Sequence, residues 1–434
     1  MFACSKCDAQ FMKWAGRCSE CGGWGTLTER AGQEINKSKK QEIKGRAPIT
    51  IALGDNKARS VPRIAIRSAE FSRVLGGGIV PGSVLLLSGE PGIGKSTLVL
   101  SLADDIGARG IVLYASGEES PEQIGGRAER MGLKNPNIRI TSETVAENIV
   151  AGMEDLKPVL TIVDSIQTTR LLSADGEPGS PTHVRGSTAI LVETAKRIGS
   201  PLVIIGQVTK EGSIAGPKLL EHLVDVVLNL EGDSNGTLRV LRAGKNRFGS
   251  TNDVGLFGMT EQGLVDVTNP SAMLLRERVI GASGSCVTSI IEGSRPLFVE
   301  IQALVTPSPF QFPVRKISGI DQNRLHMILA VLTKRANMNL SHDDVHVNAV
   351  GGIDARDASA DLAIALAIVS SKLDIALPDK LVAFGEIGLS GELRSTPFVE
   401  RRIKEAQKLG FTRVIAPSKD CRDLSTVLAS LNLR

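Results

Sequence analysis

Aromatic residues are scarce in this chain of 434 residues, where Phe, Trp and Tyr together make up 3%. Because proteins that hold single-stranded nucleic acid often stack its bases on exposed rings, this scarcity argues against stacking platforms as the main mode of binding. No apolar run approaches the roughly 18 residues that a membrane span needs, so we expect no membrane span. Met1 leads directly into Cys4, which leaves no room for a signal peptide. We therefore expect a cytoplasmic protein.

Charge and cysteine are unevenly distributed. The formal net charge is only +4, so the chain is not a polycation, but residues 1–60 hold eleven Lys and Arg against six Asp and Glu. Such a stretch is typical of a solvated linker, with a nucleic-acid contact as the alternative. Four of the six cysteines lie within the first 21 residues. This distribution favours a metal site over a disulfide framework and fits a reducing compartment.

Composition divides the chain into four regions. Residues 1–27 are rich in Cys and Gly, and residues 28–60 are polar with weak periodicity, which indicates a basic linker. Between 61 and 269, apolar strand-like runs alternate with helical stretches, a pattern that predicts βαβ units and a parallel sheet. A second α/β region covers 270–434. We predict strands at 83–88, 111–115, 159–164, 202–206, 297–305 and 413–416, and helices at 188–198, 324–336 and 360–371.

Two CxxC pairs stand near the start of the chain, ten residues apart. Each pair presents two thiolates from one tight turn, and two such turns complete a tetrahedron around Zn²⁺, whereas a redox dithiol would not explain both pairs. With so few apolar residues, this segment needs the metal in order to fold. Trp14 and Trp24 are predicted to pack within it, with a ligand-facing role as the alternative. The predicted zinc ligands are Cys4, Cys7, Cys18 and Cys21.

Residues 89–96 read Gly-Glu-Pro-Gly-Ile-Gly-Lys-Ser and match the pattern GxxxxGK[ST]. A strand-like run precedes the match and a helix-like run follows it, which is the context of a phosphate-binding loop. Glycines let backbone N–H groups face the phosphates, and the helix N-terminus adds positive potential. Lys95 is predicted to reach the β- and γ-phosphates of ATP, and Ser96 to bind Mg²⁺. The predicted ATP-binding residues are Gly89, Glu90, Pro91, Gly92, Ile93, Gly94, Lys95 and Ser96.

Three other strand ends carry polar residues suited to ATP hydrolysis. Asp164 ends an apolar run and is predicted to hold Mg²⁺ through water. Glu118 and Glu119 follow another strand, where one of them is predicted to orient the attacking water or, alternatively, to cap the next helix. Gln207 ends a third strand and is predicted either to sense the γ-phosphate or to be an ordinary polar loop residue.

The order of these motifs resembles the bacterial RadA family, also called Sms. The chain has SGEES at 116–120, DSIQ at 164–167 and GQVTKEG at 206–212, followed by IAGPK at 214–218. Farther on, VNAVGG at 347–352 and GEIGLSG at 385–391 resemble the Lon-protease-like domain of that family. The family's own signature, KNRFG, is matched by Lys245, Asn246, Arg247, Phe248 and Gly249.

The resemblance implies a RecA-like P-loop ATPase core between an N-terminal four-Cys zinc knuckle and a C-terminal Lon-protease-like α/β domain. It implies a DNA-dependent ATPase that processes recombination intermediates in the response to DNA damage and stress. Such a protein drives branch migration together with the RecA recombinase, as a hexameric ring around single-stranded and branched DNA, with ATP, Mg²⁺ and Zn²⁺. Glu118 then aligns with the catalytic glutamate and Gln207 with the γ-phosphate sensor. Lys245 and Arg247 are implied to couple neighbouring sites and DNA.

Two segments after strands of the ATPase sheet are candidates for DNA contacts. Residues 167–187 and 208–220 lie on the sheet edge where such folds place ligand loops. Their basic side chains suit phosphate contacts that are independent of DNA sequence, with plain surface loops as the alternative. These candidates are Arg170, Arg185, Lys210 and Lys218.

The C-terminal domain is predicted to lack protease activity. Lon chemistry needs a serine nucleophile and a lysine base. Alignment places Ser359 at the first position, where the family more often has alanine, but Glu400 at the second. Arg401 and Arg402 are expected to pair with Glu400, and Asp361 replaces a glycine. We predict an assembly and DNA-binding platform whose candidate phosphate contacts are Arg315, Lys316, Arg324, Lys334 and Arg335.

Three alternatives stay open at this point. A Lon-type ATP-dependent peptidase would use the C-terminal domain, and a replicative-type hexameric helicase would share the ATPase fold. A RecA-like protein that only switches on ATP is the third. KNRFG and the cysteine pairs speak against the helicase, and the acids at 118, 119 and 164 speak against the switch.

Overall fold

The computed structural model describes residues 2–6, 10–11, 13–19, 21–29, 62–207, 217–232 and 238–433. The chain separates into a unit covering 1–60 and a larger unit covering 61–434. Most of the predicted linker 28–60 lies outside the described residues.

In the described part of the larger unit, the first sheet has nine strands in the order β12-β11-β10-β9-β4-β8-β7-β5-β6. From β6 to β9 neighbouring strands run parallel, and from β9 to β12 they run antiparallel. The parallel part confirms the βαβ pattern seen in the sequence. Its strands are β4 (Val84–Gly89), β5 (Val112–Ser116), β6 (Ile138–Thr141), β7 (Leu160–Asp164), β8 (Leu202–Gln207) and β9 (Val226–Gly232). The antiparallel strands are β10 (Leu238–Asn246), β11 (Val254–Thr260) and β12 (Gly263–Asp266).

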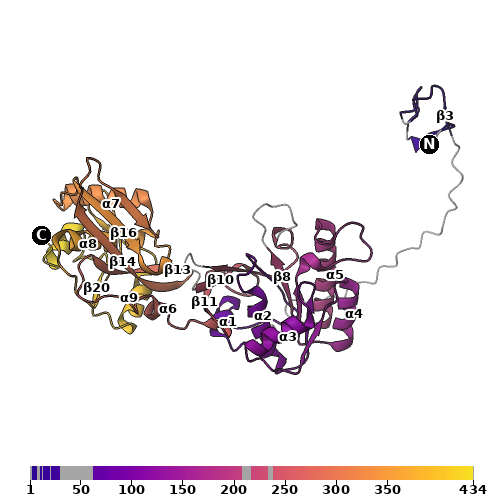
Figure 1. The fold of residues 1–434 in the computed structure, drawn as a ribbon, viewed down its shortest axis with the longest axis horizontal. Coiled ribbons are helices and arrows are strands. Elements are labelled where there is room, and N and C mark those ends of the chain that lie inside the picture. Colours follow the sequence, from indigo (N-terminus) through magenta and orange to yellow (C-terminus); the bar gives the residue numbers. More distant parts are fainter. Residues whose placement is uncertain are drawn as a thin grey trace, which may run out of the picture. The chain divides into compact units, whose positions relative to one another are not determined.

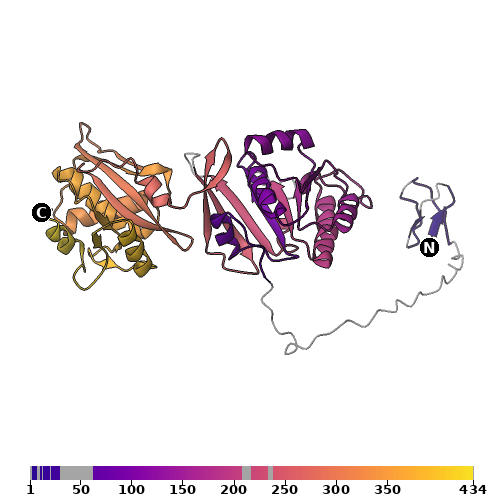
Figure 2. The ribbon, with the colours of Figure 1, turned by 90° about the horizontal axis from the view of Figure 1, so that it is seen from below.

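Helices cover both faces of this sheet (Figure 1, Figure 2). On one face, the core joins α1 (Ala69–Leu75), α2 (Lys95–Gly107) and α3 (Pro121–Arg130) to alternate residues of the strands. On the other, α4 (Ala146–Leu156) and α5 (Pro181–Ile198) pack against the remaining residues. Strands covered on both faces read as continuous apolar runs, which is why four of them were recognisable in the sequence.

The second sheet of the larger unit has six strands among the described residues, in the order β15-β16-β14-β13-β17-β20. Its strands are β13 (Ser285–Glu292), β14 (Arg295–Pro307), β15 (Arg315–Ser318), β16 (Asp343–Ala349), β17 (Leu381–Ala383) and β20 (Arg413–Ile415). The small pair β18 (Glu386–Ile387) and β19 (Leu393–Arg394) accompanies it.

Helix α8 (Asp361–Leu373) lies in the centre of this C-terminal region and is buried from 361 to 370. A helix that is apolar all round belongs in a core, and here α7 (Gln322–Arg335) and the sheet enclose it. Phe298 of β14 and Ala406 of α9 (Val399–Lys408) belong to a smaller, separate cluster. The short helices α6 (Pro270–Leu274) and α10 (Leu424–Ser430) complete the region.

One buried carboxylate joins the two sheets. Glu70 of α1 is 1% exposed and accepts hydrogen bonds from the backbone N–H of Leu256 at 3.0 Å and from the Arg295 guanidinium at 3.2 Å. Arg295 begins β14 and also donates to the Thr268 carbonyl. An ion pair with a buried carboxylate therefore connects the region of the nine-stranded sheet to the six-stranded sheet.

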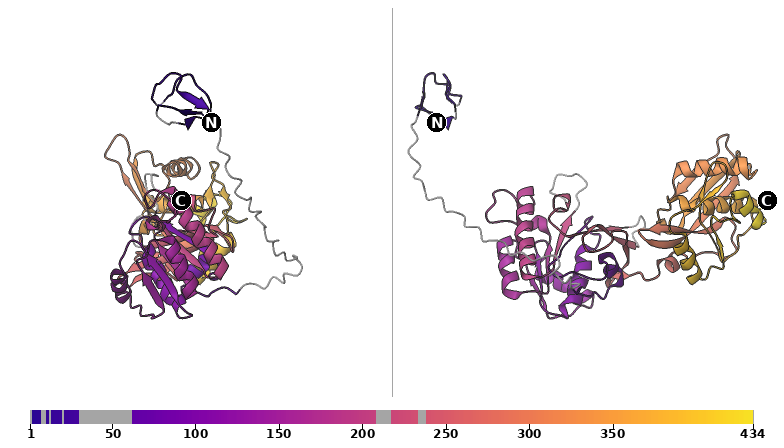
Figure 3. Two further views of the ribbon diagram at one scale, coloured as in Figure 1. Left: turned by 90° about the vertical axis from the view of Figure 1, so that its right-hand side faces the viewer. Right: turned by 180° about the vertical axis from the view of Figure 1, so that it is seen from behind.

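The smaller unit contains a three-stranded antiparallel sheet in its described part, drawn in indigo in Figure 3. Its strands are β1 (Phe2–Cys4), β2 (Gln10–Phe11) and β3 (Leu27–Glu29). Its buried residues are Cys4, Cys18 and Leu27, a core too small to fold a segment of this length without a further cross-link.

Candidate ATPase, zinc and nucleic-acid sites

The predicted phosphate loop connects β4 to α2. Gly94 is the residue before α2 and has φ 111°, which favours glycine. A Cβ on Gly89 would lie 2.5 Å from the Leu230 carbonyl oxygen, so no side chain fits at the start of the loop. Both glycines are needed for the sharp turn from strand to helix.

The Lys95 ammonium lies inside this loop. Its Nζ donates to the carbonyl oxygens of Gly89 at 3.0 Å and Glu90 at 2.9 Å. Lys95 is only 7% exposed, and burial lowers the pKa of its amine, although the charges of Asp164 and Glu118 oppose this shift. The amine is therefore fixed beside the backbone that would surround the phosphates.

Ser96 and Asp164 meet at the ends of α2 and β7. The Ser96 hydroxyl hydrogen-bonds the Asp164 carboxylate, which also accepts from the Tyr114 hydroxyl at 2.9 Å. Burial raises the pKa of Asp164, and those two hydrogen bonds counteract the shift. A hydroxyl and a carboxylate oxygen at one point are ligands that suit Mg²⁺. Tyr114 has no counterpart among the predicted site residues.

Glu118 and Gln207 also meet, although 89 residues separate them. The Gln207 side-chain amide donates to Oε1 of Glu118 at 2.7 Å, and the Ser165 hydroxyl donates to the same oxygen. Strand order explains the meeting, because β5, β7 and β8 are neighbours and their carboxyl ends share one edge of the sheet.

The two neighbouring glutamates have different partners. Glu119 forms an ion pair with Arg127 of α3, and its backbone N–H bonds the Ser116 hydroxyl. Neither Glu118 nor Glu119 caps α3, since Ser120 does so in a capping box with Gln123. Of the two acids, Glu118 is the one that faces Gln207.

These side chains surround one cavity of about 310 Å³. The predicted Lys95, Ser96, Glu118, Asp164 and Gln207 all line it. Arg127 lines it too, and it could not be predicted from the sequence because it lies on an amphipathic helix without a motif. The remaining lining residues are Pro91, Gly92, Gly94, Thr97, Glu119 and Ile205.

The KNRFG segment ends β10 and turns toward α1. The Lys245 ammonium donates to the carbonyl oxygens of Glu221 at 2.6 Å and Val224 at 2.8 Å. Arg247 is about half exposed and pairs with the buried Asp225 at 3.0 Å. Asn246 bonds the Val74 carbonyl, and the Phe248 carbonyl accepts from Arg63. The motif therefore joins the segment before β9 to the first helix of the core.

The DNA-contact candidates differ in their surroundings. Arg170 is exposed in the stretch after β7, as predicted from its position. Arg185 is exposed but lies in the second turn of α5, so its assignment to a loop was wrong. Lys218 is exposed in the short 3-10 helix Pro217–Leu219, and Lys210 lies outside the described residues.

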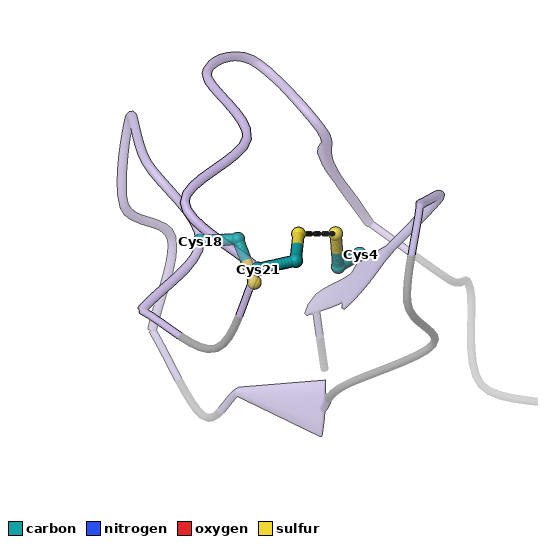
Figure 4. Close-up of side chains that lie close together, drawn as sticks. All are labelled: Cys4, Cys18 and Cys21. Carbon is teal, nitrogen blue, oxygen red and sulfur yellow. Dashed lines mark hydrogen bonds between the residues drawn. The ribbon is translucent and has the colours of Figure 1, made fainter.

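Three of the four predicted zinc ligands come together (Figure 4). The sulfur atoms of Cys4, Cys18 and Cys21 all lie within 4.8 Å of one another, and those of Cys4 and Cys21 are 3.6 Å apart. Zn–S bonds of about 2.3 Å place tetrahedral sulfurs about 3.8 Å apart, so this arrangement fits Zn²⁺. The Lys6 N–H points at the Cys4 sulfur, as in a metal knuckle. Cys7 lies outside the described residues.

The region around Ser359 differs from the prediction. Ser359 is fully buried and donates to the Ser289 carbonyl at 3.1 Å. Its neighbour is Arg402, whose Nη1 lies 3.0 Å from the Ser359 Oγ. Glu400 is exposed on α9, so its placement beside Ser359 and its expected pairing with Arg402 were wrong. Arg402 instead pairs with Asp357.

Two of the C-terminal phosphate-contact candidates are engaged inside the domain. Arg324 forms a two-pronged pair with the buried Asp361, and Arg315 donates to the carbonyls of Leu340 and Asp343. Asp361, which stands where a glycine was expected, is thus paired with the Arg324 guanidinium. Lys316, Lys334 and Arg335 remain exposed.

None of the helices in the described part of the chain is long and apolar enough to cross a membrane.

Three family models match successive parts of the chain. They are a rubredoxin metal binding domain at 2–29, an AAA domain at 63–213, and subunit ChlI of Mg-chelatase at 322–420. The first two cover the cysteine cluster and the phosphate loop.

Curated relatives match nearly the whole chain. DNA repair protein RadA of Bacillus subtilis (strain 168) is 44% identical over 425 residues, which cover 96% of this chain and 92% of that protein. The proteins of the same name from Pseudomonas aeruginosa and Escherichia coli (strain K12) are also 44% identical with the same coverage. Among solved structures, the crystal structure of the RadB recombinase is 22% identical with a TM-score of 0.38, covering 46% of this chain and 98% of that one.

Proposed function

Because this chain belongs to the RadA family of DNA repair proteins, we propose that it is a DNA-dependent ATPase that processes recombination intermediates in DNA break repair. Its work is branch migration of strand-exchange products made by the RecA recombinase. It acts as a homo-hexameric ring on single-stranded and branched DNA. The family match and the arrangement at the strand ends support this proposal.

The contact between Gln207 and Glu118 supports the hydrolytic step most directly. The amide of Gln207 donates to the carboxylate oxygen that a water-orienting base needs free. A γ-phosphate offers Gln207 a second, more negative acceptor. Once Gln207 turns to it, Oε1 of Glu118 loses one of its two donors, keeps the Ser165 hydroxyl, and can accept a hydrogen bond from the attacking water. Hydrolysis therefore requires ATP to be seated first.

The neighbouring residues bind and orient the nucleotide. Lys95 exchanges its two loop carbonyls for the β- and γ-phosphates, and Ser96 and Asp164 are the proposed ligands of Mg²⁺, which would neutralise phosphate charge when bound. Arg127 adds a cation at the cavity wall. Cys4, Cys7, Cys18 and Cys21 would hold Zn²⁺, which would supply the cross-link that the small core of this unit needs.

We propose boundaries at 27, 60 and 269 for the zinc motif, basic linker, ATPase domain and Lon-protease-like domain. Exposed Arg170, Arg185 and Lys218 are candidate DNA contacts, together with Lys210. No feature of the region around Ser359 favours the peptidase alternative, since a permanently charged guanidinium occupies the place where Lon chemistry needs a neutral amine.

The decisive experiment measures ATP hydrolysis without DNA, with single-stranded DNA and with branched DNA. Lys95→Ala is expected to lower kcat by about 10²–10³, because one charge that stabilises the transferring phosphoryl group is lost. Nucleotide binding should only weaken. A wild-type rate that neither DNA changes, or normal DNA-stimulated turnover in Lys95→Ala, would overturn the proposal.

A further inference from the structure

Both tryptophans of the chain are on the surface of the smaller unit. Trp14 is 61% exposed and Trp24 is 76% exposed, so the prediction that they pack within the segment was wrong. An indole buries a large apolar area when it packs, and one that stays in water marks an interaction surface. The chain has two tryptophans in all, and this unit has both.

The two indoles border the same point of the backbone. A Cβ built on Gly16 would lie 3.9 Å from the Trp24 ring and 4.0 Å from the Trp14 ring. Gly16 thus forms the floor between two rings on one face. We call Trp14, Gly16 and Trp24 the indole face.

Local hydrogen bonds hold the indole face to the cysteine cluster. Arg17 and Trp24 form an antiparallel bridge, and the Gly25 N–H donates to the Gly16 carbonyl at 2.9 Å. Arg17 lies between Gly16 and the proposed ligand Cys18 in the chain, so a metal bound at Cys18 would also hold the backbone that carries the rings. A preorganised surface loses little side-chain freedom when a ligand binds.

Positive charge accompanies the rings. The Arg17 guanidinium carbon lies 5.9 Å from the centre of the Trp24 ring, and its Nε donates to the Gly22 carbonyl. Lys6 and Lys13 are exposed nearby in the sequence. Residues 1–29 also contain three acids, so it is the contact between Arg17 and the Trp24 ring, and not a net charge of the segment, that places a cation on the indole face.

We propose that the indole face binds single-stranded nucleic acid, with bases stacking on Trp14 and Trp24 and phosphates contacted by Arg17 and Lys13. Flat, exposed rings accept any base, and cations beside them complement the backbone. The Arg17 guanidinium beside the Trp24 ring favours this ligand over an apolar protein surface, which offers the cation no phosphate. The site is separate from the DNA contacts proposed for the ATPase unit and does not depend on them.

Intrinsic fluorescence tests the proposal, because both emitters belong to the indole face. Zinc-loaded full-length protein is titrated, without ATP, with labelled oligothymidylate longer than the about 4–16 nucleotides that one stacking site covers. Tryptophan emission should be quenched in parallel with the rise in anisotropy of the label. Binding at the ATPase unit alone raises anisotropy and leaves emission unchanged, and that result would overturn the proposal.

Two substitutions sharpen the test. Trp24→Ala should weaken binding about 5- to 150-fold, the range expected for one stacked base, whereas Trp24→Phe retains a ring and most of the affinity. Zinc content is measured in both, so that a folding defect is recognised. Phe398→Ala removes an exposed ring elsewhere and should change nothing.

A protein ligand gives a different outcome. If emission responds only when the recombinase is added, and oligothymidylate leaves it unchanged, the indole face is a protein-docking surface and the proposal is wrong. DNA-stimulated ATP hydrolysis is measured on the same samples. Quenching without stimulation, or stimulation without quenching, separates the failure of one proposal from that of the other.

Discussion

Glu118 and Glu119 are adjacent in sequence but differ in what they contact. Glu118 faces Gln207 and Ser165 in the cavity, whereas Glu119 is neutralised by Arg127. A carboxylate that only neutral groups hydrogen-bond can exchange them for water and take part in proton transfer. A carboxylate in an ion pair is better suited to positioning the cation that it holds. The structure thus separates two acids that their position after a strand left equivalent, and the one facing Gln207 is Glu118, to which the family resemblance also pointed.

Replacing each acid by its amide tests this difference. Glu118→Gln is expected to lower kcat by about 10²–10⁴, the range for losing a positioned base, while ATP still binds. Glu119→Gln, the matched control, should reduce kcat far less because only the orientation of Arg127 changes. Steady-state hydrolysis and nucleotide binding are measured together. Equal losses in the two variants would contradict the assignment.

Arg402 connects three elements around Ser359. Its fully buried guanidinium donates to Pro397 and Ser289 carbonyls, lies beside Ser359, and pairs with Asp357. Burial alone raises the pKa of Asp357, but hydrogen bonds from Ser359 and the charge of Arg402 outweigh it and lower that pKa. Ser359 is therefore part of a structural cluster that joins β13, α9 and the turn just before α8.

Arg402→Ala should destabilise the protein by about 3–5 kcal/mol, because it removes a fully buried guanidinium that pairs with Asp357 and bonds the Pro397 and Ser289 carbonyls. Arg401→Ala is the control next to it: Arg401 is exposed, and its loss should cost no more than about 1 kcal/mol. Urea unfolding measures both. A change below 1 kcal/mol for Arg402→Ala would show that the cluster is not structural.

The same packing predicts that the purified protein does not cleave unfolded casein in the presence of ATP and Mg²⁺. Ser359 is buried and its neighbour cannot accept a proton, since a guanidinium stays charged at any ordinary pH. Ser359→Ala is the control. Cleavage that disappears in this variant would restore the peptidase alternative.

Substitutions in the KNRFG segment are expected to uncouple ATP hydrolysis from DNA binding, because the segment connects several elements. Lys245 and Arg247 connect β10 to the segment 221–225, which lies beyond Gln207 in the chain. Lys245→Ala and Arg247→Ala should leave nucleotide binding intact while DNA no longer stimulates hydrolysis. ATPase stimulation and branch migration are measured on the same preparations. Wild-type values for both would make the motif merely structural.

At the scale of the whole molecule, the smaller unit depends on its metal. We expect one zinc per chain, lost in Cys18→Ser/Cys21→Ser, because the three described sulfurs lie within 4.8 Å of one another, which fits a tetrahedral site. Since the larger unit has its own cores, its thermal unfolding should be unchanged in this variant. Metal analysis and calorimetry test the two statements. Full zinc retention would refute the ligand set.

Local patterns carried most of the correct predictions. The phosphate loop and Asp164 stand at the ends of strands that are buried on both faces. Such strands are visible in the sequence as continuous apolar runs, so these residues could be predicted. Arg402 could not be found this way. Glu400 and Arg402 are two positions apart, so they point to nearly opposite sides of α9, and packing alone decides which one faces Ser359. Similarly, nothing in the spacing reveals that Arg127 reaches Glu119.

The buried pair of Glu70 and Arg295 limits how this chain can be recombined with its relatives. A chimera that exchanges the C-terminal region alone separates the carboxylate from its guanidinium, unless the donor supplies an arginine at the start of its own β14. Glu70, which is 1% exposed, would then keep only its ion pair with Arg73 at 3.3 Å and the hydrogen bond from Leu256, and the fold would lose the connection to β14. The region with the nine-stranded sheet and the region with the six-stranded sheet are thus not freely interchangeable, because an exchange keeps this contact only when Glu70 and Arg295 are inherited together.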